Sequence, residues 1–187
     1  MVLCLFVICM VCSALLAGVY ALTKETIEIG DAQRNEAANK EVLPDGAVIM
    51  DKLTLEGNES IEYIKAMRAD STIVGYVVDV ATTGFGGPIK MKVGFNVDGI
   101  VWNVKVLSHA ETPGLGAKCT EPAFSKQFCK LDPSDEKNLK VKKDGGNLNA
   151  ITASTITSRA YADGVAQAVE VFKAIVATPM PLNDMEE

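Results

Sequence analysis

The chain has 187 residues, which is enough for one domain of ordinary size and an additional segment. Its 18 Lys and Arg against 24 Asp and Glu give a formal net charge of −6, and this acidic balance argues against nucleic acid as a partner. Every charged side chain lies after position 23, so an uncharged N-terminal segment precedes an ordinary polar sequence.

Residues 2–22 contain no charged side chain. As a helix that rises about 1.5 Å per residue, this segment spans roughly 30 Å, the thickness of the hydrocarbon core of a bilayer. The alternative is a cleaved signal peptide, but the apolar run is longer than the usual stretch of about 7 to 15 residues and has no basic segment before it. We therefore expect residues 1–23 to form a transmembrane anchor, whose orientation the flanking charges leave open.

Three cysteines of this segment, Cys4, Cys9 and Cys12, have the C-x4-C-x2-C spacing of plant-type ferredoxins. An apolar helix would point them in different directions and offers no fourth thiolate, so we expect small apolar side chains and no metal site. Cys119 and Cys129 are the remaining pair, and their spacing allows a disulfide outside the cytoplasm without requiring one.

Residues 24–46 are rich in Glu, Ala, Asn and Lys, which favours a helical stalk that Pro44-Asp45-Gly46 ends. Val97-Asp98-Gly99 has the composition of a hairpin turn, so the sheet that follows is expected to be mostly antiparallel. Its strands are predicted from β-branched residues and period-two alternation, at Ile61–Met67, Thr72–Ala81, Lys90–Asn96 and Ile100–Leu107.

A short helix at Ala123–Cys129 and a charged connection at Leu131–Gly146 are expected to precede a long amphipathic helix. The sequence thus predicts an α+β fold, with one mostly antiparallel-sheet domain at 47–178, flanking helices and a disordered tail at 179–187. The apolar residues of the long helix recur at helical spacing: Ile156, Ala160, Tyr161, Val165, Ala168, Val169, Phe172, Ile175 and Val176.

Two loops between the predicted elements are richer in glycine and proline than ordinary turns. The first holds Gly84, Gly86 and Gly87, which permit positive φ and a close approach of backbone to a flat ligand, although a long hairpin loop explains them equally well. The second runs from His109 to Gly116, and Pro113-Gly114 within it suits a type II turn. A lone histidine without a second ligand is more often a hydrogen-bonded structural residue than a metal ligand.

Hydroxyl side chains cluster between positions 149 and 158, immediately before the long helix. Thr157 or Ser158 could cap its first turn. The free N–H groups and the positive dipole end of a helix favour an anion such as phosphate. From residues alone, a well-capped helix after a loop is the simpler explanation of the cluster, which consists of Thr152, Ser154, Thr155, Thr157 and Ser158.

The segment Asn149–Ser158 resembles the flavinylation motif of the FMN-binding domain family, Asp-Ala-Ile-Ser-Gly-Ala-Thr-x-Thr-Ser. In that family a flavin transferase joins the phosphate of FMN to the threonine that corresponds to Thr155. The chain departs from the motif at Asn149, Ala153 and Ser154, and Ser154 places a second hydroxyl beside Thr155.

The likeness extends to both loops, because the family carries a Gly-x-Gly-Gly loop and a near-identical His-x-Glu-Thr-Pro-Gly-Leu-Gly segment. The resemblance therefore implies covalent FMN at Thr155 and roles in binding it for the other motif residues. These residues are Ser154, Thr152, Thr157, Ser158, Gly84, Gly86, Gly87, His109, Glu111, Thr112, Pro113, Gly114, Leu115 and Gly116.

The family includes components of ion-translocating membrane oxidoreductases. The resemblance implies a membrane-anchored electron-transfer subunit of an Rnf-type ferredoxin:NAD oxidoreductase, with its flavin domain on the extracytoplasmic side of the cell membrane. Its partners would be the other membrane subunits and the flavin transferase. Alternatives are a subunit of a sodium-pumping NADH:quinone oxidoreductase, whose chains are typically longer, and a non-redox membrane-anchored binding module. A hydrolase using His109 and Glu111 is disfavoured, because no Ser or Cys nucleophile motif accompanies them.

Overall fold

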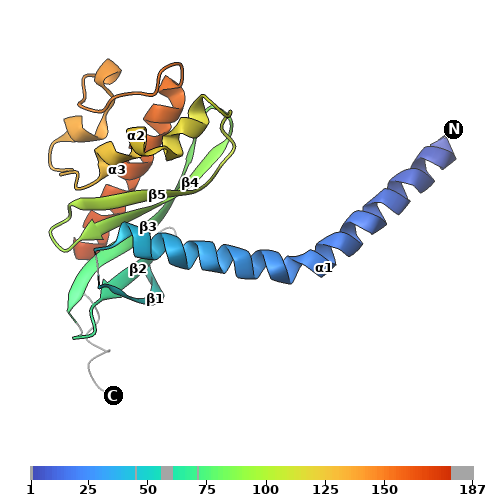
Figure 1. Ribbon diagram of the computed structural model, residues 1–187, viewed down its shortest axis with the longest axis horizontal. Helices are drawn as coiled ribbons and strands as arrows, with labels where there is room; N and C mark the ends of the chain where they lie inside the picture. The colour runs from blue at the N-terminus through green and yellow to red at the C-terminus, as the bar shows by residue number, and fades with distance from the viewer. Residues whose placement is uncertain (1, 45, 56–60, 71, 178–187) are drawn as a thin grey trace. The chain divides into compact units, whose positions relative to one another are not determined.

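The computed structural model describes residues 2–44, 46–55, 61–70 and 72–177 (Figure 1). The chain divides into two compact units, Met1–Ala37 and Ala38–Glu187. Helix α1 (Val2–Val42) continues without interruption from the uncharged segment into the expected stalk and ends just before Pro44. All of it up to Ala37 belongs to the first unit. The expected disordered tail, 179–187, lies outside the described residues.

Helix α1 is long and apolar enough to cross a membrane, with a mean hydropathy of 2.8 over its most apolar window and none of that window buried. Cys4, Cys9 and Cys12 are exposed free thiols on this helix. The buried residues of α1 are Ala38, Asn39 and Val42, in its last turns, which belong to the second unit.

The second unit is built on a five-stranded sheet in which every pair of neighbouring strands is antiparallel. The four predicted strands are confirmed with ends that shift by at most two residues, and an edge strand, β1, was not predicted. A bulge between Ile49 and Lys52 breaks the alternation by which a strand is recognised in a sequence. In spatial order the strands are β1 (Val48–Leu55), β2 (Ile61–Met67), β3 (Ile73–Thr83), β4 (Pro88–Asn96) and β5 (Val101–His109).

The two faces of the sheet are covered differently, as strand β4 shows. Its side chains Ile89, Met91, Val93 and Phe95 alternate onto the face that packs in the main core. On the other face, the backbone of Val42 lies so close to Gly94 that a Cβ there would overlap the Val42 carbonyl. The end of α1 therefore packs on the centre of the sheet, in a second cluster made of Val42, Leu43, Ile64, Ala66 and Val77.

The same face of β4 carries Lys92, whose side chain is almost fully buried. Its ammonium nitrogen lies 2.6 and 2.8 Å from the two carboxylate oxygens of Asp79 on the neighbouring strand β3. A buried charge is tolerated when it is paired and hydrogen-bonded, so the partly exposed Asp79 carboxylate compensates the buried Lys92 ammonium group.

Helix α3 (Thr155–Ala177) covers the other face of the sheet (Figure 1) and packs mainly on β3 and β4. Gly164 allows this close approach, because a Cβ there would press on Thr82 and Met91. The predicted apolar stripe of the helix is confirmed as buried, with two exceptions. Ile156 and Val176 are more than half exposed, since they lie at the two ends of the helix beyond the sheet.

Short helices connect β5 to α3. The predicted helix Ala123–Cys129 is present as α2 (Pro122–Ser125) followed by the 3-10 turn η2 (Lys126–Phe128). Cys119 and Cys129 are free thiols in the structure, so no disulfide joins them. The remaining 3-10 turns are η1 (Gly116–Thr120), η3 (Glu136–Leu139) and η4 (Lys142–Asp144).

Candidate functional site

One cavity of about 430 Å³ lies where the three sequence motifs meet. It is bounded by the β3–β4 loop, by the segment after β5 and by the first turn of α3. Its volume falls in the usual range for sites that hold small molecules. The residues that line it are Phe85, Glu111, Thr112, Leu115, Gly116, Ala153, Ser154, Thr155, Ile156 and Thr157.

Glu111 ties the three motifs together and is only 6% exposed. Its Oε1 accepts a hydrogen bond from the Gly86 N–H at 3.0 Å, and its Oε2 accepts one from the Thr157 hydroxyl at 2.8 Å. One carboxylate thus joins the β3–β4 loop to the helix that carries the hydroxyl cluster. Hydrogen bonds to a buried charged group are among the stronger ones in proteins, so this carboxylate fixes the shape of the cavity.

The glycines of the two loops allow the backbone to pack closely around Glu111. A Cβ on Gly84 or Gly116 would overlap the Glu111 carboxylate, and one on Gly86 would overlap the carbonyl of Ala110. These backbones therefore approach another part of the same chain. The sequence left both a flat ligand and a hairpin loop open as the reason for the glycines. The β3–β4 connection is also a tight hairpin, closed by a hydrogen bond of 2.8 Å from the Gly84 N–H to the Gly87 carbonyl.

Positive φ is confined to other glycines of the two loops. Gly87 has a φ of 143° and Gly114 a φ of 77°. The Leu115 N–H donates to the Thr112 carbonyl at 3.2 Å, which closes the predicted turn around Pro113-Gly114. Pro113 and Gly114 are exposed and lie outside the lining of the cavity, so the turn presents Thr112 and Leu115 to it.

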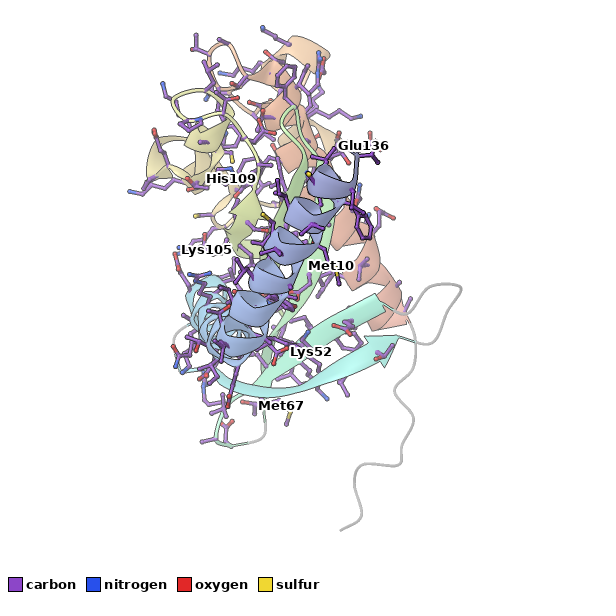
Figure 2. All side chains as sticks on the ribbon, turned by 90° about the vertical axis from the view of Figure 1, so that its right-hand side faces the viewer. Met10, Lys52, Met67, Lys105, His109 and Glu136 are labelled. Carbon is purple, nitrogen blue, oxygen red and sulfur yellow. The ribbon has the colours of Figure 1, made fainter. Side chains whose placement is uncertain are left out.

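His109 is the last residue of β5, on the strand that also carries Lys105 (Figure 2). Its Nδ1 accepts a hydrogen bond from the Glu111 N–H at 3.2 Å. The ring is half-buried and does not line the cavity. This contact positions Glu111, in keeping with the structural role expected of a lone histidine.

Thr155 is the first residue of α3, so the helix begins earlier than the predicted caps. Thr157 and Ser158 lie inside its first turn and do not cap it. The buried Ser158 hydroxyl accepts from the Ile151 N–H and donates to the Ser154 carbonyl, each at 2.9 Å, and so closes the turn before the helix. Thr155 is half-buried at the cavity wall, beside Ser154.

Ala153 has a φ of 61°, in the left-handed region that glycine adopts most readily. The common form of the flavinylation motif has glycine at this position. Ala153 thus adopts, with a Cβ, a backbone conformation that favours glycine and is strained for other residues. Thr152 is exposed and lines a different pocket, together with Asn149 and Ile151.

Several residues of the site carried no clear sequence signal. Phe85 is 73% exposed and Ile156 53% exposed, yet both line the cavity, and large apolar side chains left in water next to a pocket suit a flat apolar ligand. The glycines around Phe85 were the only hint of its role. Lys143 donates to the Thr155 hydroxyl at 3.1 Å across a separation of 12 residues, which no local pattern reveals.

The side chains that line the cavity match the chemistry of FMN. Apolar side chains at the mouth suit a flavin ring, and a hydroxyl at a helix N-terminus beside a lysine suits a phosphate. Residues 84–170, which contain all of these groups, match the family model described as an FMN-binding domain. The fold and the site therefore define a flavin-binding domain.

Similar proteins of known name indicate which kind of flavin-binding protein this is. The G subunit of an ion-translocating oxidoreductase complex from Methanosarcina acetivorans is 35% identical, over 90% of this chain and 90% of the relative. The G subunit of a Na(+)-translocating ferredoxin:NAD(+) oxidoreductase complex from Acetobacterium woodii is 33% identical, over 90% and 88%. The chain belongs to the FMN-binding domain family, among relatives named as the G subunit of such complexes.

A solved structure supports the fold. The C subunit of a Na(+)-translocating NADH-quinone reductase from Parabacteroides distasonis aligns with 79% of this chain and 85% of its own length, with a TM-score of 0.53. The two sequences are 17% identical in this alignment, so the likeness concerns the fold alone.

Proposed function

We propose that this chain is the membrane-anchored, flavin-carrying electron-transfer subunit of an Rnf-type ion-translocating ferredoxin:NAD oxidoreductase. The observation that carries this proposal is the meeting of all three family motifs around one cavity, with Thr155 in its wall at the start of α3. The G-subunit relatives, which match nearly the whole chain, favour this assignment over the NADH:quinone alternative. A non-redox binding module would not require these motifs together.

The flavin is held covalently, by a phosphoester at Thr155. The hydroxyl oxygen of Thr155 attacks the phosphorus of a flavin nucleotide whose phosphate carries a nucleotide leaving group. The Oγ1–P bond forms, the anhydride P–O bond breaks, and the hydroxyl proton passes to a base of the flavin transferase. Ser154 is the neighbouring hydroxyl, but its residue is 9% exposed, whereas Thr155 is less buried.

The protein's part in electron transfer is to hold and tune the flavin. Bound FMN supplies one- and two-electron redox chemistry. Phe85, Leu115 and Ile156 would shield its ring from water, since all three are exposed apolar side chains at the cavity. The buried Glu111 carboxylate places negative charge at the cavity wall. This charge favours the oxidised over the reduced flavin, because reduction adds electrons to the ring.

Residues 1–23 anchor the subunit in the cell membrane and 47–178 form the flavin domain, on the extracytoplasmic side. Covalent attachment suits that location, where free FMN would be lost by dilution. The other membrane subunits of the complex deliver and accept the electrons, and the anchor raises the local concentration of the flavin domain beside them.

The test is co-expression of the full chain with a flavin transferase. Wild-type protein should show acid-stable flavin fluorescence on a denaturing gel and the added mass of one FMN phosphoester. Thr155→Ala should lose both while keeping its circular dichroism, and Ser154→Ala should retain both. Fluorescence that persists in Thr155→Ala would move the attachment to another hydroxyl, and a wild-type protein without flavin would refute the proposal.

A further inference from the structure

The side chain of Lys143 reaches the modification site from outside the motif. Its ammonium nitrogen donates a hydrogen bond to Thr155 Oγ1 at 3.1 Å. Lys143 belongs to the short turn η4, in the charged connection that the sequence suggested was only a surface linker. A lysine on a solvent-exposed linker gains little by folding back onto a neutral hydroxyl, because ordering its side chain costs entropy.

The turn that carries Lys143 is fixed against the first turns of α3. Asp144 accepts two hydrogen bonds from Arg159, at 2.6 and 2.7 Å. Thr155 and Arg159 are four residues apart and so lie on one face of the helix. Gly145, with a φ of 81°, ends the turn. Two successive side chains of η4 thus contact two successive turns of α3, which places the ammonium group at Thr155.

Arg159 and Lys143 differ in whether their positive charge is already paired with a carboxylate. The Arg159 guanidinium donates both of these hydrogen bonds to the Asp144 carboxylate. The guanidinium lowers the pKa of Asp144, so this carboxylate is ionised at neutral pH. Lys143, by contrast, forms no ion pair of its own in the described part of the chain. The cation beside Thr155 that remains available to an anion is therefore Lys143.

We propose that Lys143 positions the Thr155 hydroxyl for flavin attachment and then binds the phosphodiester that results; this role rests on the function proposed above. An ammonium group donates and cannot accept, so Lys143 engages a lone pair of Oγ1 and leaves the hydroxyl hydrogen free for the base of the transferase. After the bond forms, one negative charge lies on the phosphodiester. The ammonium group then forms a charge-assisted hydrogen bond to it in place of a neutral one.

The test compares the full chain with three variants during co-expression with a flavin transferase. Lys143→Gln keeps a polar, hydrogen-bonding side chain that is one atom shorter and removes its charge, and Lys143→Arg keeps the charge. Lys142→Gln is the matched control, because Lys142 is an exposed lysine in the same turn. We expect flavin incorporation, followed by intact mass, to be about tenfold slower in Lys143→Gln, and close to wild type in Lys143→Arg and Lys142→Gln.

A second measurement reports on the attached phosphate. In fully flavinylated protein, the phosphorus NMR resonance of the phosphodiester should shift in Lys143→Gln and stay unchanged in Lys142→Gln. Lys143→Gln with the wild-type rate and resonance would overturn the role of Lys143 and leave the covalent flavin intact. A Lys143→Arg variant as slow as Lys143→Gln would also overturn it. A wild-type chain that gains no flavin phosphate would instead overturn the covalent function itself.

Discussion

Glu111 accepts hydrogen bonds from a backbone N–H of the β3–β4 loop and from a hydroxyl of α3, and its own N–H is held by His109. A buried donor that loses its acceptor destabilises the fold by its full desolvation free energy. The effect of a substitution at Glu111 therefore depends on whether the new side chain can still accept these hydrogen bonds. Glu111→Gln can still accept from Gly86, since the Thr157 hydroxyl can reverse its direction and accept from the new amide.

We therefore expect Glu111→Ala to lower the free energy of unfolding by about 2–4 kcal/mol and Glu111→Gln by about 1 kcal/mol. Urea unfolding measures both. In flavinylated protein, Glu111→Gln should also raise the reduction potential, because it removes a negative charge from the cavity wall. An alanine variant that unfolds at the wild-type urea concentration would show that the carboxylate does not tie the motifs together.

Ala153 offers a prediction of opposite sign. Its φ of 61° strains any residue with a Cβ, and Ala153→Gly relieves that strain while adding entropy to the unfolded chain. The net result should be a gain of about 0.5–1 kcal/mol in unfolding free energy. Ala166→Gly, in the interior of α3, is the control and should lose about 1 kcal/mol. If both variants are destabilised alike, the left-handed backbone at 153 is not maintained.

At the scale of elements, the β3–β4 loop and the segment after β5 interlock through one side chain. Gly116→Ala should be destabilising because its Cβ would overlap the Glu111 carboxylate. In the double variant Gly116→Ala/Glu111→Ala the overlap with the carboxylate is gone, and only the contact of 2.9 Å with the Cβ of residue 111 remains. The two losses should therefore fall short of additivity by more than about 0.5 kcal/mol. A double-mutant cycle in urea measures this coupling, and strict additivity would mean that the glycine is needed for another reason.

Elements with regular periodicity were predictable from the sequence, and contacts between distant elements were not. Strands β2 to β5 and helix α3 follow from alternation and helical spacing, whereas the bulge at Ile49–Lys52 hides β1. The hydroxyl cluster was identified, but the start of α3 at Thr155 depends on Ser158 bonding back to Ile151. The bond from Thr157 to Glu111 spans 46 residues, and nothing local encodes it.

At the scale of the whole molecule, the first unit of the chain has one task if the proposed function holds, which is to keep the flavin domain at the membrane. Val11→Asp places a charge within the apolar part of α1, at a cost of about 2.5–3.5 kcal/mol for insertion. We expect less protein in carbonate-washed membranes and a matching loss of ferredoxin-dependent NAD reduction. Val11→Leu is the control. Unchanged activity in the presence of a soluble Val11→Asp protein would contradict the need for an anchor.

The burial of Ala38, Val42 and Leu43 in the second unit has a consequence for proteolysis. Val42 and Leu43 complete the core on one face of the sheet. Ala38 and Val42 nevertheless lie in the same helix that begins in the apolar segment. Trypsin acting on detergent-solubilised protein should therefore release a stable fragment that begins after Lys24 or Arg34, in the exposed part of α1. A cut after Lys40 would strip Ala38 from the core. The fragment that survives should thus begin in the middle of a helix, where no loop marks the end of the domain.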